Sequence, residues 1–437
     1  MRNHQWVVLV CMFLVAIGIA NVIMTVSYPE RLRSWGFDGD AIAFMGAVRS
    51  YLNGTSLYFI STPPASADLQ PYLTRFLYPP PAVWVLLPFF VWHGAVAGPL
   101  WMLLTIVLFL AVAYSLGMGL ARHLEVQTPE LMGGLIAVTL ALWYPLVHHL
   151  GVGQVDVAVM GLCYYATIHR KRNAAAAAVA LTLATALKAY PAALAFYLVL
   201  ADGRKSARFA IYYAIALSAT TVAALASFGA DSFSEWLRVI SYKNAQANPY
   251  IVNQSFIASL NRTIGPDSGH WHRMLVPLVR HLLQTVMPVL TCVVLWRRSR
   301  RFAALPLLDP YNAFIVCYAS ISPIFWVQSY VLLLPLVVSL TGGALRTSWA
   351  CLRLTAAGML MGALLIQFTV WFNPPPAHSI VGVVEFMLYH RYTASLAMLV
   401  AAWMLMSFDW SRKPSSTPLL CEELRDTQPC RSRRIAQ

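Results

Sequence analysis

The chain has 437 residues, of which 59% are hydrophobic and only 11% are charged. Soluble domains carry about 25% charged residues, so this composition excludes a soluble globular protein and indicates one that crosses a membrane several times. The net charge of +14 does not indicate nucleic-acid binding, because the basic residues lie between apolar runs and in the tail. The scattered cysteines form no C-x-x-C pair and predict neither disulfides nor a zinc site.

Apolar segments of about 20 residues are long enough to cross a bilayer as helices. The first, residues 5–27, exceeds the apolar core of a signal peptide (about 7–15 residues) and ends in no A-x-A-like site, so a retained helix is expected. Basic clusters between the segments would lie in the cytoplasm, and so would both termini. Ten crossings are predicted in this way, at residues 5–27, 95–120, 131–148, 152–169, 207–229, 274–296, 308–323, 327–345, 354–372 and 391–408.

Two further apolar segments are interrupted by prolines. Residues 78–94 are short and proline-rich, which favours a surface or half-depth helix. Residues 173–201 have basic flanks at both ends, so we expect a hairpin of two short helices whose tip, Lys188–Pro191, lies near the outer face; broken helices are tolerated where they line a cavity. The expected fold is therefore an all-α polytopic membrane bundle of about 10–12 helices with external juxtamembrane helices.

The remaining segments are polar or aromatic, and the alternating topology places three of them outside. These are residues 28–94, 230–273 and 373–390. One transmembrane domain is expected over residues 1–410, followed by a disordered cytoplasmic tail at 411–437.

The first external segment holds two aspartates in a chain that is poor in acids. Asp40 precedes an apolar pattern that includes Phe44, Ala47 and Tyr51, one face of a helix, and this predicts a helix lying along the outer membrane surface. Asp38 or Asp40 could simply cap that helix. The alternative is that Asp40 is a general base held at the boundary between water and membrane.

Three polar residues interrupt the apolar helices. Gln154 and Asp156 open a predicted membrane helix, where an acid is costly and often functional, although a solvated cap would also explain it. Lys188 stands alone in an uncharged stretch; it either snorkels to the interface or meets a phosphate in a polar cavity.

Two later stretches carry amides and aromatics on the same predicted side. Residues 248–264 contain Asn253, Gln254 and Arg262; amides bind sugar hydroxyls and arginine binds phosphate, whereas an ordinary polar loop is the alternative. Trp326 and Gln328 follow a helix break, and Trp326 could equally be an interfacial anchor. Together these groups indicate a site for a sugar joined to a lipid phosphate.

The order of these motifs resembles glycosyltransferase family 87, the polyprenyl-phosphate-mannose-dependent mannosyltransferases of the GT-C superfamily, from about residue 5 to 340. Two departures are an Asp156 where the family has asparagine, and the absence of a histidine shortly after Trp326, where Gln328 and Ser329 stand. The matching residues are Asp40, Phe44, Ala47, Gly54, Leu57 and Tyr58; Phe76, Tyr78, Pro79 and Pro80; Gly153 and Gln154; Lys188 and Pro191; Asn253, Gln254, Ser255 and Arg262; and Ser322, Pro323 and Trp326.

The resemblance implies an inverting α-mannosyltransferase (a hexosyltransferase) of the bacterial inner membrane, with its active site on the outer face. Asp40 would take the proton of an acceptor hydroxyl, with Asp38 as reserve, while Lys188 and Arg262 would stabilise the leaving phosphate. No metal or cofactor is implied, and the sequence offers no tight acidic cluster. The expected partners are a polyprenyl phosphate sugar, a glycolipid or polysaccharide acceptor and the bilayer. The residues expected to bind sugar or acceptor are Asp38, Tyr78, Gln154, Asp156, Asn253, Gln254, Trp326 and Gln328.

Other functions remain open at this point. A GT-C enzyme could transfer arabinofuranose or a hexose other than mannose. A lipid-linked glycan flippase or other transporter would distribute charges through its helices and show a two-fold repeat, neither of which is evident. A receptor or structural protein is the third alternative.

Overall fold

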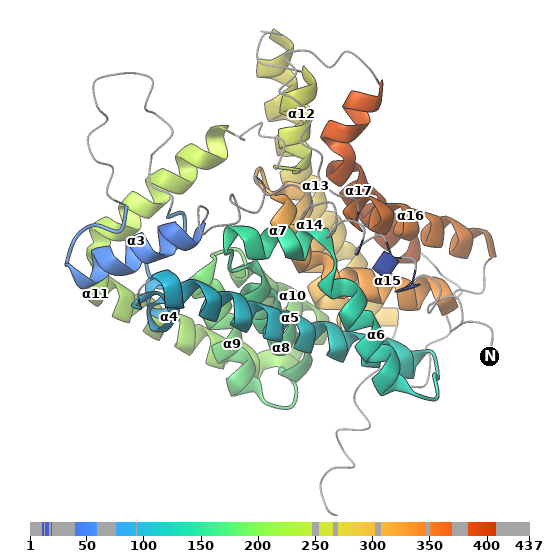
Figure 1. Ribbon diagram of the computed structural model, residues 1–437, viewed down its shortest axis with the longest axis horizontal. Coiled ribbons are helices and arrows are strands. Elements are labelled where there is room, and N and C mark those ends of the chain that lie inside the picture. The colour runs from blue at the N-terminus through green and yellow to red at the C-terminus, as the bar shows by residue number, and fades with distance from the viewer. Residues whose placement is uncertain are drawn as a thin grey trace, which may run out of the picture.

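The computed structural model describes residues 11–12, 14–16, 19, 40–58, 76–92, 94–246, 253–264, 270–301, 307–346, 350–368 and 383–407 (Figure 1). Regular structure within these ranges is helical, apart from one β-bridge that joins Asn253 to Trp326. The predicted all-α, polytopic membrane fold is confirmed. Most of the predicted crossing at 5–27, the residue Asp38 and the tail at 411–437 lie outside the described residues.

The helices follow one another with short connections. Their bounds are α3 Asp40–Leu52, α4 Ala82–Phe90, α5 Gly94–His123, α6 Pro129–Ala141, α7 Tyr144–Val152, α8 Asp156–His169, α9 Ala174–Leu187, α10 Ala192–Asp202, the 3-10 helix η2 Gly203–Ser206, α11 Ala207–Gln246, α12 Phe256–Ile264, α13 His270–Arg301, α14 Asp309–Ile321, the 3-10 helix η4 Val327–Leu333, α15 Leu334–Arg346, α16 Ala350–Phe368 and α17 Val383–Ser407.

Four stretches of the described chain are long and apolar enough to cross a membrane. They are Val96–His123, Ala192–Ser241, Met274–Arg298 and Val327–Leu345, and a fifth is added if α6 and α7 form one bent span. Apolar side chains face outward on two of them, for example Val222 on α11 and Leu282 on α13, as expected for surfaces in contact with lipid. The larger count of 10–12 passes stays a prediction.

The predicted crossing at 131–148 is wrong as a single helix. Its two halves, α6 and α7, meet at an angle of 58°. Pro145 lies in the first turn of α7, and because proline has no backbone N–H it cannot bond the carbonyl four residues earlier, so the helical ladder ends at Ala141. The break between α9 and α10 at Lys188–Pro191 is as predicted.

The predicted external segment 230–273 is largely helical. Helix α11 continues past its break at Gly229, where φ is +73°, to Gln246, and α12 follows. Figure 1 shows α5, α8 and α9 packed side by side with α11 against α9, while α12 contacts both α13 and α17. The polar ends of these two groups of helices position the candidate site.

Candidate active site

Helix α3 places Asp40 at its first turn. Ala41, Phe44 and Val48 are buried on one face of this helix, so the apolar spacing that predicted the helix also fixes how it docks. The Asp40 side chain is half-buried, and a carboxylate at a helix N-terminus is favoured by the helix dipole.

Tyr78 connects Asp40 to the interior. Its hydroxyl oxygen lies 2.8 Å from Gln154 Oε1 and 3.3 Å from Asp40 Oδ2, and its ring packs edge-on against Phe44 with centroids 4.9 Å apart. Burial, and then the negative charges of Asp40 and Asp156, raise the pKa of Tyr78 well above its ordinary value. The phenol therefore stays protonated and acts as a hydrogen-bond donor.

Gln154 is held by the tight end of α7. Gly153 takes the left-handed conformation with φ +70°, and a Cβ on it would lie 2.8 Å from the Ala41 side chain. Only glycine meets both demands, which are the turn and the close approach of α3. Trp101 Nε1 also donates to the Gln154 carbonyl at 3.3 Å.

Asp156 and Lys188 form a buried ion pair. Asp156 opens α8 and is fully buried, and its Oδ1 lies 2.5 Å from Lys188 Nζ. Ser329 Oγ donates to Asp156 Oδ2 at 2.8 Å, and the Tyr190 hydroxyl lies 3.4 Å from Oδ1. Lys188 ends α9 in an extended conformation before Pro191, and its ammonium sits 5.6 Å from the centroid of the Tyr78 ring.

These contacts define one connected group, which we call the Asp–Lys cluster. Sequence analysis did not single out Tyr190 or Ser329, although both stand inside stretches that it examined. The cluster consists of Asp40, Tyr78, Gln154, Asp156, Lys188, Tyr190 and Ser329. It combines a half-exposed carboxylate with a lysine about one ring-width away from the connecting tyrosine.

A second group is built on Asn253 and its neighbours, and we call it the Asn253 clamp. Asn253 Oδ1 accepts from the Phe325 N–H at 2.9 Å, and its Nδ2 donates to the Pro323 carbonyl at 3.1 Å. The Gln254 side chain accepts from the Thr393 N–H at 3.1 Å. Asn253 and Gln254 are both fully buried, so their side-chain amides hold together segments that are distant in the sequence.

Arg262 also belongs to the clamp. Its Nη1 donates to the Asn253 carbonyl at 2.6 Å. Burial lowers the pKa of Arg262 to about 10, so the guanidinium remains charged at neutral pH. Trp326 pairs with Asn253 through its backbone, and Gln328, in η4, is buried. The structure thus places Lys188 in one group and Arg262 in the other.

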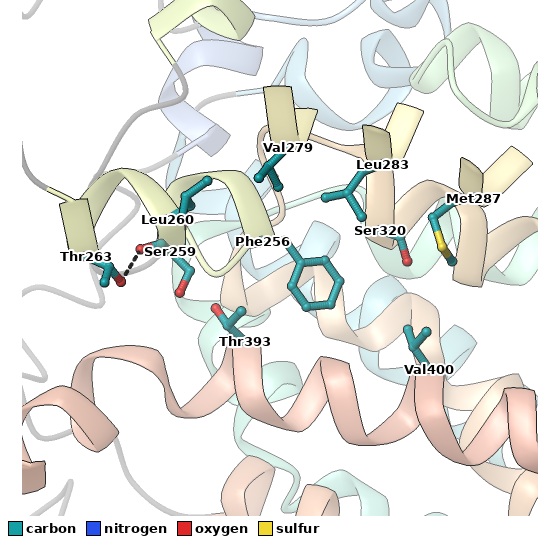
Figure 2. Close-up of a pocket in the computed structure, with 10 residues that line it drawn as sticks. All are labelled: Phe256, Ser259, Leu260, Thr263, Val279, Leu283, Met287, Ser320, Thr393 and Val400. Atoms are coloured by element: carbon teal, nitrogen blue, oxygen red, sulfur yellow. Dashed lines mark hydrogen bonds between the residues drawn. The ribbon is translucent and has the colours of Figure 1, made fainter. Parts of the chain in front are cut away.

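An apolar groove lies beside the clamp, between α12, α13 and α17 (Figure 2). Its volume is about 410 Å³. Figure 2 shows Val279, Leu283 and Met287 on one side and Thr393 with Val400 on the other. The full lining is Phe256, Ser259, Leu260, Thr263, Val279, Leu283, Met287, Ser320, Thr393 and Val400.

The fold and these groups define a multi-pass helical membrane protein with a polar cluster at the ends of its helices. Residues 76–320 match glycosyltransferase family 87; this is more than half of the chain, which therefore belongs to that family and is a membrane glycosyltransferase. The matched range contains Tyr78, Gln154 and Lys188, whereas Asp40 precedes it and Trp326 follows it. Comparison with curated proteins finds no match, and neither does comparison with solved structures.

Proposed function

We propose that the protein transfers mannose from a polyprenyl phosphate to a glycolipid or polysaccharide acceptor at the outer face of a bacterial inner membrane, inverting to an α linkage. The observation that carries this proposal is the Asp–Lys cluster, which presents a carboxylate and an ammonium on either side of Tyr78. Membership of a glycosyltransferase family and the apolar surface for a lipid-linked donor support it.

The reaction would be one displacement at the anomeric carbon. The acceptor hydroxyl gives its proton to Asp40 as its oxygen bonds to that carbon. The bond from the carbon to the phosphate oxygen breaks, and its electron pair leaves with the polyprenyl phosphate. Lys188 stabilises that developing charge by turning from Asp156 toward the phosphate, while Tyr78, Gln154 and Asp156 orient the sugar.

The Asn253 clamp receives a different role from the one predicted from sequence. Because the amides of Asn253 and Gln254 bond to the protein, we assign them to positioning the chain around Trp326 rather than to binding sugar. Arg262 braces the same clamp through the Asn253 carbonyl, so Lys188 becomes the principal phosphate ligand.

Removing the clamp should therefore reduce stability more than substrate binding. Asn253→Ala leaves buried backbone groups of Pro323 and Phe325 without partners, and we expect a cost of about 2 kcal/mol. Thermal unfolding in detergent measures this, with Asn173→Ala as the control, because the Asn173 side chain only caps α9 at an exposed site. An unchanged melting temperature together with a raised donor KM would return Asn253 to the sugar site.

We assign the groove of Figure 2 to the prenyl chain of the donor. It borders α13, whose Leu278 and Leu282 are exposed on the face expected to contact lipid, and α12, which carries Arg262. A groove continuous with such a surface suits an apolar chain better than a soluble partner.

Filling the groove should weaken binding of long-chain donors. Leu283→Trp narrows it, and we expect KM for a long-chain polyprenyl phosphate mannose to rise about tenfold, which corresponds to about 1.4 kcal/mol. KM for a farnesyl phosphate mannose should stay unchanged. The matched control is Leu282→Trp, on the lipid-facing side of the same helix turn. A raised KM for the acceptor alone would show that the acceptor's lipid occupies the groove.

The transferase proposal is tested by label transfer in proteoliposomes that contain the full chain and a bacterial glycolipid extract. We expect radiolabel from polyprenyl phosphate mannose to enter glycolipid or polysaccharide, and none to be transferred directly from GDP-mannose. Transfer from polyprenyl phosphate arabinofuranose alone would replace the sugar. Movement of the labelled lipid across the bilayer without any covalent transfer would contradict the proposal and indicate a flippase.

A further inference from the structure

One buried histidine stands beside the Asp–Lys cluster without a role in the steps above. His149 lies on α7 and is fully buried, and neither ring nitrogen meets a hydrogen-bond partner of good geometry among the residues that the structure describes. Its backbone carbonyl accepts from the N–H of Gly153 at 3.1 Å and of Gln154 at 3.3 Å. The same turn therefore positions the histidine and the amide that bonds Tyr78.

The surroundings of the ring are polar. Helix α7 packs against η4, the ring lies beside the backbone of Gln328, and the charges of Asp156 and Lys188 both act on it. Gln328 is itself 6% exposed, and its Oε1 also has no partner among the described residues. Two adjacent elements thus contribute one buried, unpaired polar side chain each.

Unpaired buried groups of this kind cost stability, about 1–3 kcal/mol each, and native proteins contain few of them without a reason. An apolar residue at either position would avoid that cost. A polar ligand group, bound between α7 and η4, explains why both side chains are retained at this place.

The chemistry of the pair selects the ligand group. A hydroxyl can accept a hydrogen bond from the imidazole N–H and donate one to an amide oxygen. A phosphate oxygen can only accept, so it would face Gln328 Oε1 unfavourably. In the proposed reaction the phosphate meets Lys188 and is bonded to the anomeric carbon, which brings the sugar ring into the same neighbourhood.

We propose that His149, with Gln328, binds a hydroxyl of the donor's sugar ring and thereby selects the sugar. This inference rests on the proposed function. It makes His149 a specificity-determining residue that the sequence analysis did not single out.

The test pairs a residue with a substrate hydroxyl. Polyprenyl phosphate mannose and its monodeoxy analogues at each ring hydroxyl serve as donors, and kcat/KM is measured in proteoliposomes for the wild type and His149→Ala. We expect the wild type to prefer mannose over one of the analogues by about 10- to 100-fold. In His149→Ala this preference should vanish for that analogue and persist for the others.

A matched control is His148→Ala on the same helix, whose ring stacks on Tyr144 with centroids 6.0 Å apart; its donor preference should equal that of the wild type. His149→Gln, which keeps polar atoms at the site, should retain part of the preference and guards against misfolding of the alanine variant. An equal loss on every donor, or no loss, would overturn the inference and leave a structural role or a bridging water. Failure of the wild type to use any polyprenyl phosphate sugar would instead overturn the proposed function.

Discussion

Asp40→Asn is expected to lower kcat for sugar transfer by about 1000-fold, because an amide cannot accept the proton of the attacking hydroxyl. The substitution keeps the shape of the side chain, and the Tyr78 hydroxyl, 3.3 Å from Asp40 Oδ2, can still donate to an amide oxygen. Folding and donor binding should therefore be nearly unchanged. Initial rates of radiolabel transfer in proteoliposomes, together with thermal unfolding, measure both expectations.

The matched control for this experiment is Glu235→Gln on α11. Glu235 is a carboxylate of the same end of the molecule that accepts a hydrogen bond from Ser56 Oγ at 2.7 Å, and it has no part in the proposed reaction. Near-normal transfer is expected. If Asp40→Asn were as active as the control, the role of base would pass to Asp38 or Asp156.

Lys188→Met is expected to lower kcat by about 100- to 1000-fold, because it removes the positive charge that meets the leaving phosphate. It should also destabilise the fold by about 3–5 kcal/mol, since the fully buried Asp156 would lose its counter-charge. Asp156→Asn alone should cost less, because the lysine side chain is 20% exposed and can be solvated.

The double variant Lys188→Met with Asp156→Asn separates the two effects. It contains no uncompensated charge, so thermal stability should recover toward that of the wild type while transfer stays low. Recovery of activity along with stability would show that Lys188 acts only through folding and would contradict its assignment to the phosphate.

The parts of the fold that could be predicted are those written in local patterns. The helix that begins at Asp40 follows from apolar residues on one face, and the break at Lys188–Pro191 follows from a proline within a short apolar segment between basic flanks. The bend between α6 and α7 was missed because apolar residues surround Pro145 and keep the hydropathy high through the break. The continuation of α11 past Gly229 was missed because glycine and polar residues resembled the end of a helix.

The site could be predicted only as a set of residues. Local sequence indicated Asp40, Tyr78, Gln154, Asp156 and Lys188, and the structure brings these five together. What holds them apart from the Asn253 clamp depends on pairing between distant segments, such as Asn253 with Trp326, which leaves no periodic signal. A lone histidine in an apolar run, such as His149, looks like an ordinary core residue until its neighbours are known.

The most direct test of the central claim is a structure of the Asp40→Asn variant in a lipid nanodisc with polyprenyl phosphate mannose bound. The account predicts the phosphate within hydrogen-bond distance of Lys188 Nζ, about 3 Å, with the Asp156 pair opened and the anomeric carbon turned toward position 40. A phosphate bound at Arg262, with the Lys188–Asp156 pair intact, would contradict it.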